Sequence, residues 1–367
     1  MSMIEQQPSF RQGEEERVAC RFVVALEAFG RALEECAADD MEGRVRCHRK
    51  MGDCLRMLGE FRKAEEHYGK ALEYARAGSD EVEEADTMVG LALCIRGVGR
   101  LEDARDLIER ALSTYQDFDD PEGESFALWA LGGVWRFSGA LSRARQCFET
   151  ALELSGLLGD QTGVGYTLCG LGGLSRVMGD FSASREYYTR AHRVLEDVGD
   201  VFGAAYSACG IANANRMQGA YEEALRHFGR ATELYRRIGD RISFAYTLWA
   251  KATACKMVGM WDHALEGFEA SHKIFEDTGD RRGMIYSLLG MSELALLKDD
   301  RVKAEGHWDE AHRLCEASAF HVESCHCRLI GFFVSGGQGD LNALRRDYRR
   351  LGMDFPPEEV KPPINIP

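Results

Sequence analysis

Three segments share one pattern: GALSRARQCFETA (139–151), GDFSASREYYTRA (179–191) and GAYEEALRHFGRA (219–231). Each has a glycine, a small residue five positions later, an aromatic ring four further on and another small residue three beyond. The pattern returns every 40 residues, and its glycine slots are Gly59, Gly99, Gly139, Gly179, Gly219, Gly259 and Gly339, with Asp299 in the remaining slot. A strict period of this length indicates a stacked repeat rather than a closed globule.

Each repeat is predicted to be a pair of helices. Apolar residues at helical spacing indicate a first helix over Ser125–Ser138, which Gly139 ends because glycine enters the left-handed conformation easily. A second helix near Leu141–Gly156 places its small residues and its ring on one face, so the two helices can approach closely. A Gly-Asp dipeptide then closes the unit, at 159–160, 199–200, 239–240 and 279–280, where the aspartate can cap the next helix.

The pattern divides the 367 residues into five parts. We expect a disordered N-terminus (1–16), a capping helix or partial repeat (17–44), seven 40-residue units (45–320), a degenerate capping helix pair (321–353) and a proline-rich tail (354–367). The tail holds five of the seven prolines, so it is predicted to be extended or disordered rather than helical. It is either a frayed end or a docking peptide, for a partner or for this protein's own groove.

The repeat resembles the tetratricopeptide repeat. The resemblance rests on the small residue at the eighth place of the first helix, on the turn, and on the ring–x–x–Ala of the second helix, with the eighth place held by Gly52, Ala92, Gly132, Gly172, Ala212 and Ala252. The 40-residue length is similar to that of Pins-type scaffolds, kinesin light chains and MalT-type sensor domains. The resemblance implies an all-α solenoid, a right-handed superhelix of antiparallel helix pairs whose first helices line a concave wall.

Composition excludes several classes of function. The net charge of −15 argues against general nucleic-acid binding, which needs a basic face. The sequence lacks a run of eighteen apolar residues and a signal-peptide core, so we expect no membrane span. The twelve cysteines show no disulfide-like framework, which favours reduced thiols and a cytoplasmic location. The oligomeric state stays open.

The residues expected on the concave wall form two ladders. We count the places of each first helix so that Ser125 is place 1. Place 12 of successive first helices carries a cation, and place 2 carries an aromatic ring in many repeats. Two repeats have tryptophan at place 5, and one has asparagine at place 9. We predict that these residues bind a partner: Arg56, Arg96, Arg136, Arg176, Arg216, Lys256, Trp129, Tyr166, Tyr206, Asn213, Tyr246, Trp249 and Tyr286. Arginine pairs with carboxylates, and rings receive apolar side chains, so the ladders suit an extended, acidic peptide or helix.

Each ladder also has a purely structural interpretation. The cations could pair with glutamates of neighbouring helices, and the rings could pack between adjacent first helices. Pins-type scaffolds hold peptides with an asparagine ladder at place 9, where this chain keeps only Asn213. Their peptide specificity is therefore not expected here.

A cluster of cysteines and histidines lies near the C-terminal end. His312, Cys315, His321 and Cys325 are spaced so that neighbouring helices could bring them together as a tetrahedral zinc site. Their spacing matches no zinc-finger pattern, and the alternative is a capping helix that tolerates these residues. We predict no metal and no cofactor.

No catalytic motif is present in the sequence: there is no P-loop, dinucleotide-binding fingerprint, GxSxG or HExxH. The chain is therefore predicted to be a non-catalytic scaffold or adaptor that binds a protein or peptide in its groove. Two alternatives stay open, a regulatory sensor that responds to a small molecule or partner, and a maturation factor that uses the cysteine–histidine cluster.

Overall fold

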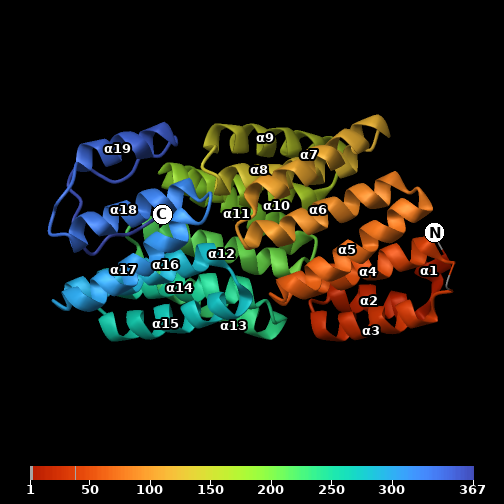
Figure 1. Cartoon of the computed structure of the whole chain (residues 1–367), viewed down its shortest axis with the longest axis horizontal. Coiled ribbons are helices and arrows are strands. Elements are labelled where there is room, and N and C mark those ends of the chain that lie inside the picture. Colours follow the sequence, from red (N-terminus) through yellow and green to blue (C-terminus); the bar gives the residue numbers. More distant parts are fainter. Residues whose placement is uncertain (1–2, 38) are drawn as a thin grey trace.

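The computed structural model describes residues 3–37 and 39–367, and every regular element among them is an α-helix (Figure 1). The helices are α1 (Met3–Gln6), α2 (Pro8–Val18), α3 (Phe22–Glu35), α4 (Met41–Met57), α5 (Phe61–Gly78), α6 (Glu81–Gly97), α7 (Leu101–Asp117), α8 (Pro121–Phe137), α9 (Leu141–Leu158), α10 (Gln161–Met178), α11 (Phe181–Asp197), α12 (Val201–Met217), α13 (Tyr221–Ile238), α14 (Arg241–Met257), α15 (Trp261–Thr278), α16 (Arg281–Leu297), α17 (Arg301–Glu316), α18 (His321–Val334) and α19 (Leu341–Arg350). Successive helices pack as antiparallel pairs and stack into an α-solenoid (Figure 1).

The helix boundaries follow from turn and cap chemistry. Gly139 adopts φ +81° after α8, and Asp299 takes the same left-handed conformation, φ +59°, in the slot without glycine. The predicted first helix at Ser125 in fact begins at Pro121, because the Asp120 side chain accepts a hydrogen bond from the Gly123 amide at 3.0 Å. The capping aspartate therefore lengthens each first helix by about one turn beyond its apolar stretch.

Second-helix rings are held between two first helices, although α7 carries Ile108 at this place instead of a ring. Tyr188 of α11 lies between Gly172 of α10, in its own unit, and Gly210 of α12, in the next. A Cβ added at Gly172 would lie 2.8 Å from the ring, and one added at Gly210 would lie 2.1 Å from it, so only a hydrogen atom fits at either position. Tyr68 and Phe148 are clamped between glycine pairs in the same way. The ring therefore sets the spacing both within and between repeats.

The superhelix is wound so tightly that later helices lie against the turns of earlier repeats. Gly99, after α6, faces Phe320 before α18, and Gly139 faces His321. Arg282 of α16 lies over the Phe137 ring of α8, with its guanidinium carbon 4.5 Å from the ring centroid. The concave wall is consequently an enclosed interior, in which side chains of distant repeats face one another.

The two ends of the chain are more ordered than the sequence predicts. Residues 1–16 were expected to be disordered, but from Met3 onward they form α1 and most of α2, and Phe10 packs edge-on against Phe29 with centroids 5.3 Å apart. The reason is that Phe10 buries its ring in a core shared with α3, α12 and α13. Residues after Arg350 are non-helical and run back among the helices, so that the C-terminal mark in Figure 1 lies beside α16 and α18. Of the helices described, none is long and apolar enough to cross a membrane.

The glycine clamp predicts opposite effects for two glycine-to-alanine changes. Gly210→Ala should lower the free energy of unfolding by about 1–3 kcal/mol, because the new methyl group overlaps Tyr188. Gly229→Ala in α13 has no atom within 4 Å of the added Cβ and should raise stability by up to about 1 kcal/mol, as alanine favours helix. Urea unfolding measures both, and equal effects of the two changes would contradict the clamp.

Asp280, which caps α16, predicts a pH dependence of stability. Burial raises the pKa of this carboxyl to about 6, although the Gly283 amide, Arg282 and the Tyr246 hydroxyl favour its charged form. The native state then holds a proton that the unfolded chain releases between about pH 4 and 6, so stability falls as pH rises through this window. The stability of the wild type relative to Asp280→Asn should fall by up to about 3 kcal/mol from about pH 4 to 7. If the difference in stability between the wild type and Asp280→Asn did not change with pH, burial would not raise the pKa of Asp280.

Candidate functional site

The cations of place 12 point along the concave wall toward the next first helix. Three of them, Arg96, Arg136 and Lys256, meet the residue 37 positions later, as the Lys256 ion pair with Glu293 illustrates. The equivalent partner of Arg96 is Gly133, and that of Arg136 is Gly173, where an added Cβ would lie 2.3 Å and 2.6 Å from the respective guanidinium nitrogens. The residue at place 9 of the next repeat therefore decides whether a cation finds a carboxylate or only backbone.

None of the five place-12 arginines forms an ion pair among the described residues. Arg56 lies near Asp53 and Arg216 is held by the segment after α19, which leaves three without such a partner. Among the residues that the structure describes, no ion pair forms at Arg96, Arg136 or Arg176. The Nε atoms of Arg96 and Arg136 are buried without a hydrogen-bond partner. By contrast, Lys256 is paired with Glu293, and Arg282 with Glu323 at 2.6 Å. The middle of the interior thus carries positive charge that the protein itself leaves uncompensated.

The unpaired arginines repel one another in a partly dehydrated space. Burial and the neighbouring Arg136 lower the pKa of Arg96 to about 10, and burial together with Arg282 lowers that of Arg136. Both guanidinium carbons lie over the Phe137 ring, at 5.0 Å and 5.1 Å, opposite Arg282. An anion placed here would relieve this repulsion, and cations of this kind bind carboxylate or phosphate strongly when water is excluded.

The aromatic ladder joins adjacent repeats. The indole nitrogens of Trp129 and Trp249 each donate to a main-chain oxygen of the next first helix, that of Tyr166 or Tyr286, at 3.2 Å. The hydroxyls of Tyr166 and Tyr246 donate to the capping aspartates Asp200 and Asp280, at 2.9 Å and 3.1 Å. These contacts give the rings the structural role that the sequence left open.

The other residues predicted to bind a partner each make different contacts within the protein. Tyr206 is half-buried and stacks on Phe202, and Tyr286 donates to Glu323 beside Arg282. Asn213 donates to the Cys209 carbonyl at 3.2 Å and accepts from Arg216 at 3.3 Å. Tyr68 donates to Asp53 near Arg56, and both groups raise the pKa of Arg56 against the effect of its burial.

The sequence did not single out Glu293 as part of this wall, and it left docking of the proline-rich tail in the groove as one of two open alternatives. Glu293 is fully buried and accepts from both Lys256 and the Ile364 amide. Its signal was present, since it occupies the place where the four repeats before it have glycine, glycine, asparagine and threonine. The non-helical segment after α19 occupies the wall at Arg216 and Lys256, so these two cations are already engaged.

The cysteine–histidine cluster does not form the metal site that its spacing allowed. Over the described residues, no three His, Cys, Asp or Glu side chains come together as metal ligands. His312 stacks on Trp308 with centroids 5.0 Å apart and faces Glu316, whereas Cys315 is buried beside Cys327. His312 and Cys315 thus have separate partners, and the four candidates are not brought together.

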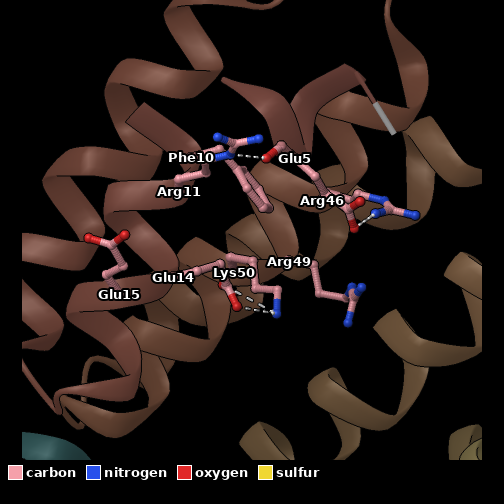
Figure 2. Close-up of a pocket in the computed structure, with 8 residues that line it drawn as sticks. All are labelled: Glu5, Phe10, Arg11, Glu14, Glu15, Arg46, Arg49 and Lys50. Carbon is pink, nitrogen blue, oxygen red and sulfur yellow. Dashed lines mark hydrogen bonds and ion pairs between the residues drawn. The ribbon is translucent and has the colours of Figure 1, made fainter. Parts of the chain in front are cut away.

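A pocket of about 370 Å³ lies between α1, α2 and α4 (Figure 2). Its charges are compensated within the protein: Lys50 pairs with Glu14 at 3.3 Å, and Arg46 pairs with Glu5. Arg49 reaches out of the pocket to Glu83 and Asp86, at 3.0 Å and 3.1 Å. The pocket is therefore a poorer anion site than the concave wall.

Comparison with known proteins agrees with this architecture. A family model described as tetratricopeptide repeat matches residues 83–155 and 164–237, and no curated protein matches the chain. A Rap protein complexed with competence and sporulation factor superposes with a TM-score of 0.68, at 14% identity over 83% of each chain. Cut9–Hcn1 of the APC/C gives a TM-score of 0.58 at 14% identity over 90% of this chain and 57% of that one.

Aspartyl phosphate phosphatase F from Bacillus subtilis covers 98% of both chains, with a TM-score of 0.53 at 12% identity. Similarities at this level of identity concern the fold alone. The match to the repeat model identifies tetratricopeptide repeats over residues 83–155 and 164–237, and the 40-residue helix pairs and the solved structures show that the chain has the same solenoid fold.

Proposed function

We propose that this protein is an interaction scaffold whose concave wall binds an extended, acidic segment of a partner protein. The observation that carries the proposal is the row of arginines at 96, 136 and 176, which have no carboxylate partner among the described side chains. These side chains are half-buried, and charges partly removed from water are costly unless they are paired, so the unpaired row favours a ligand that brings the missing charge.

The chemistry of the wall favours a carboxylate-bearing peptide over an isolated ion. The three arginines occupy successive repeats, so a ligand must be extended to reach all of them. Each charge-assisted hydrogen bond contributes about 1.5–3 kcal/mol, and several on one ligand act together. The Phe137 ring between the arginines offers apolar contact to the same segment.

The solenoid itself is typical of protein-interaction scaffolds. The Rap protein of similar fold was crystallised with competence and sporulation factor, and Cut9 was crystallised with Hcn1. These structures support the idea that such a wall receives another molecule. The choice of an acidic segment rests on the arginines of this chain.

Removal of the three charges should abolish selective binding of acidic peptides. We expect a displayed library of random dodecapeptides to yield carboxylate-rich binders with the wild type. Arg96→Gln/Arg136→Gln/Arg176→Gln should weaken their affinity at least about tenfold, because each lost contact contributes about 1.5–3 kcal/mol. Fluorescence anisotropy of the selected peptides measures the change.

The matched control removes the same charge from exposed second-helix positions, as Arg185→Gln/Arg226→Gln/Arg230→Gln. This variant should bind the selected peptides like the wild type. Equal losses in the two triple variants would reduce the effect to net charge, and selected peptides without carboxylates would overturn the proposal.

The unpaired positive charge should also lower the free energy of unfolding of the ligand-free protein. Arg136→Met keeps the aliphatic contact with Phe137 and removes the repulsion, so it should raise the free energy of unfolding by about 1–2 kcal/mol. Arg282→Met leaves the buried Glu323 without its partner and should lower it by about 3–5 kcal/mol. Urea unfolding of both variants tests this contrast, and destabilisation by Arg136→Met would show that its charge is internally compensated.

A further inference from the structure

The non-helical segment after α19 runs inside the solenoid. The Asp354 amide donates to the Met178 carbonyl at 2.9 Å, and Phe355 packs edge-on against Tyr348 with centroids 5.5 Å apart. The segment then reaches α16, α14 and α12, where Ile364 and Ile366 are 3% and 5% exposed. A proline-rich segment without helix has therefore become part of the interior.

Two cations of the ladder hold the main chain of this segment. Lys256 Nζ donates to the Ile364 carbonyl at 2.9 Å. Both terminal nitrogens of Arg216 donate to the Ile366 carbonyl, at 3.1 Å and 3.2 Å. Successive repeats thus bind alternate carbonyls of the segment, which is the spacing of an extended chain whose alternate side chains point the same way.

The remaining contacts favour a particular side-chain pattern. Ile364 and Ile366 are buried, whereas Asn365 between them pairs with Arg216 through both parts of its carboxamide. Its Nδ2 donates to the Arg216 carbonyl at 2.9 Å, and its Oδ1 accepts from the guanidinium. The Ile364 amide donates to Glu293. This part of the wall therefore suits an apolar–carboxamide–apolar sequence in extended conformation.

Arg216 depends on the segment for its hydrogen bonds. Its side chain is fully buried, and no carboxylate among the described residues pairs with it. Among the residues that the structure describes, its guanidinium donates only to Asn213, Asn365 and the Ile366 carbonyl. Burial and the nearby Arg176 lower its pKa to about 9, which matches a cation whose only acceptors are neutral. Close packing of the helices does not by itself require hydrogen-bond acceptors around Arg216. A site that binds an extended peptide does require them, because it must pair with the peptide main chain.

We propose that residues 362–367 are a resident ligand of the concave wall, held at Arg216 and Lys256, and that a partner's extended segment must displace them to occupy the whole wall. The segment leaves the arginines at 96, 136 and 176 without a partner among the described residues, so the wall has an occupied apolar part and a vacant cationic part. The claim that a partner competes for the wall rests on the proposed function. The claim that residues 362–367 are bound to the wall as a ligand does not.

The test uses the full chain with the segment released. Ile364→Ser/Ile366→Ser removes the two buried side chains without adding charge, and Glu358→Ser/Lys361→Ser changes two exposed residues of the same segment as a matched control. The probe is a fluorescein-labelled peptide with the sequence of residues 361–367, KPPINIP. Anisotropy measures its binding, and circular dichroism checks that helicity is unchanged.

The released variant should bind the peptide, whereas the wild type and the control should bind at least tenfold more weakly. The tethered segment is present at an effective concentration of about 1 mM and therefore excludes the added peptide. Adding Lys256→Met or Arg216→Gln to the released variant should reduce binding at least tenfold. Failure of the folded, released variant to bind KPPINIP, or equal binding by the wild type, would overturn the proposal.

Hydrogen exchange gives an independent readout that does not depend on a peptide. The Ile364 amide should be protected in the wild type and in the control, and it should exchange rapidly in the released variant. Rapid exchange in the wild type would overturn the resident ligand.

The acidic peptides selected above separate the two proposals. They should bind the released variant more tightly than the wild type, and equal affinities would overturn the competition while leaving the proposed function intact. Binding of KPPINIP without any acidic binder would support the resident ligand and refute the proposed function.

Discussion

The close approach of neighbouring helices at the second-helix ring is the constraint on which the rest of this structure depends. Tyr188 fits between Gly172 and Gly210 only because neither glycine has a side chain. Repetition of this contact fixes the rotation from one repeat to the next, and the accumulated rotation brings α16 and α18 against the early turns. The enclosed interior is thus a consequence of small residues rather than of any residue that faces it.

Enclosure changes the meaning of the basic ladder. On an open surface, arginines in successive repeats would be screened by water and would contribute little. Inside the solenoid, Arg96 and Arg136 lie over one ring opposite Arg282, and their pKa values fall. Under the proposed function, the arrangement that costs the ligand-free protein stability is also the one that binds an anionic segment, which is a common relation between stability and function.

One position in each repeat determines what its neighbouring cation does. Where place 9 of the next first helix is glycine, as at Gly133 and Gly173, the arginine lies over backbone. Where it is Glu293, the lysine is neutralised and also holds the Ile364 carbonyl. Substitution along this single place therefore divides a uniform ladder into a cationic part and a part that binds the main chain of an extended segment.

The sequence by itself determined the helical repeat, its period, the turns, the capping aspartates and the concave ladders, because these depend on residues close together in the chain. It left the roles of Trp129 and Tyr166 open, and it named His312 and Cys315 only as candidates for a metal site that was not predicted. Its prediction of disorder before Phe10 was wrong. Only the tertiary structure decided which cations are paired, which rings join repeats, and that Ile364 and Ile366 occupy the wall. These outcomes depend on contacts between residues far apart in sequence, whose geometry is set by the accumulated superhelical rotation.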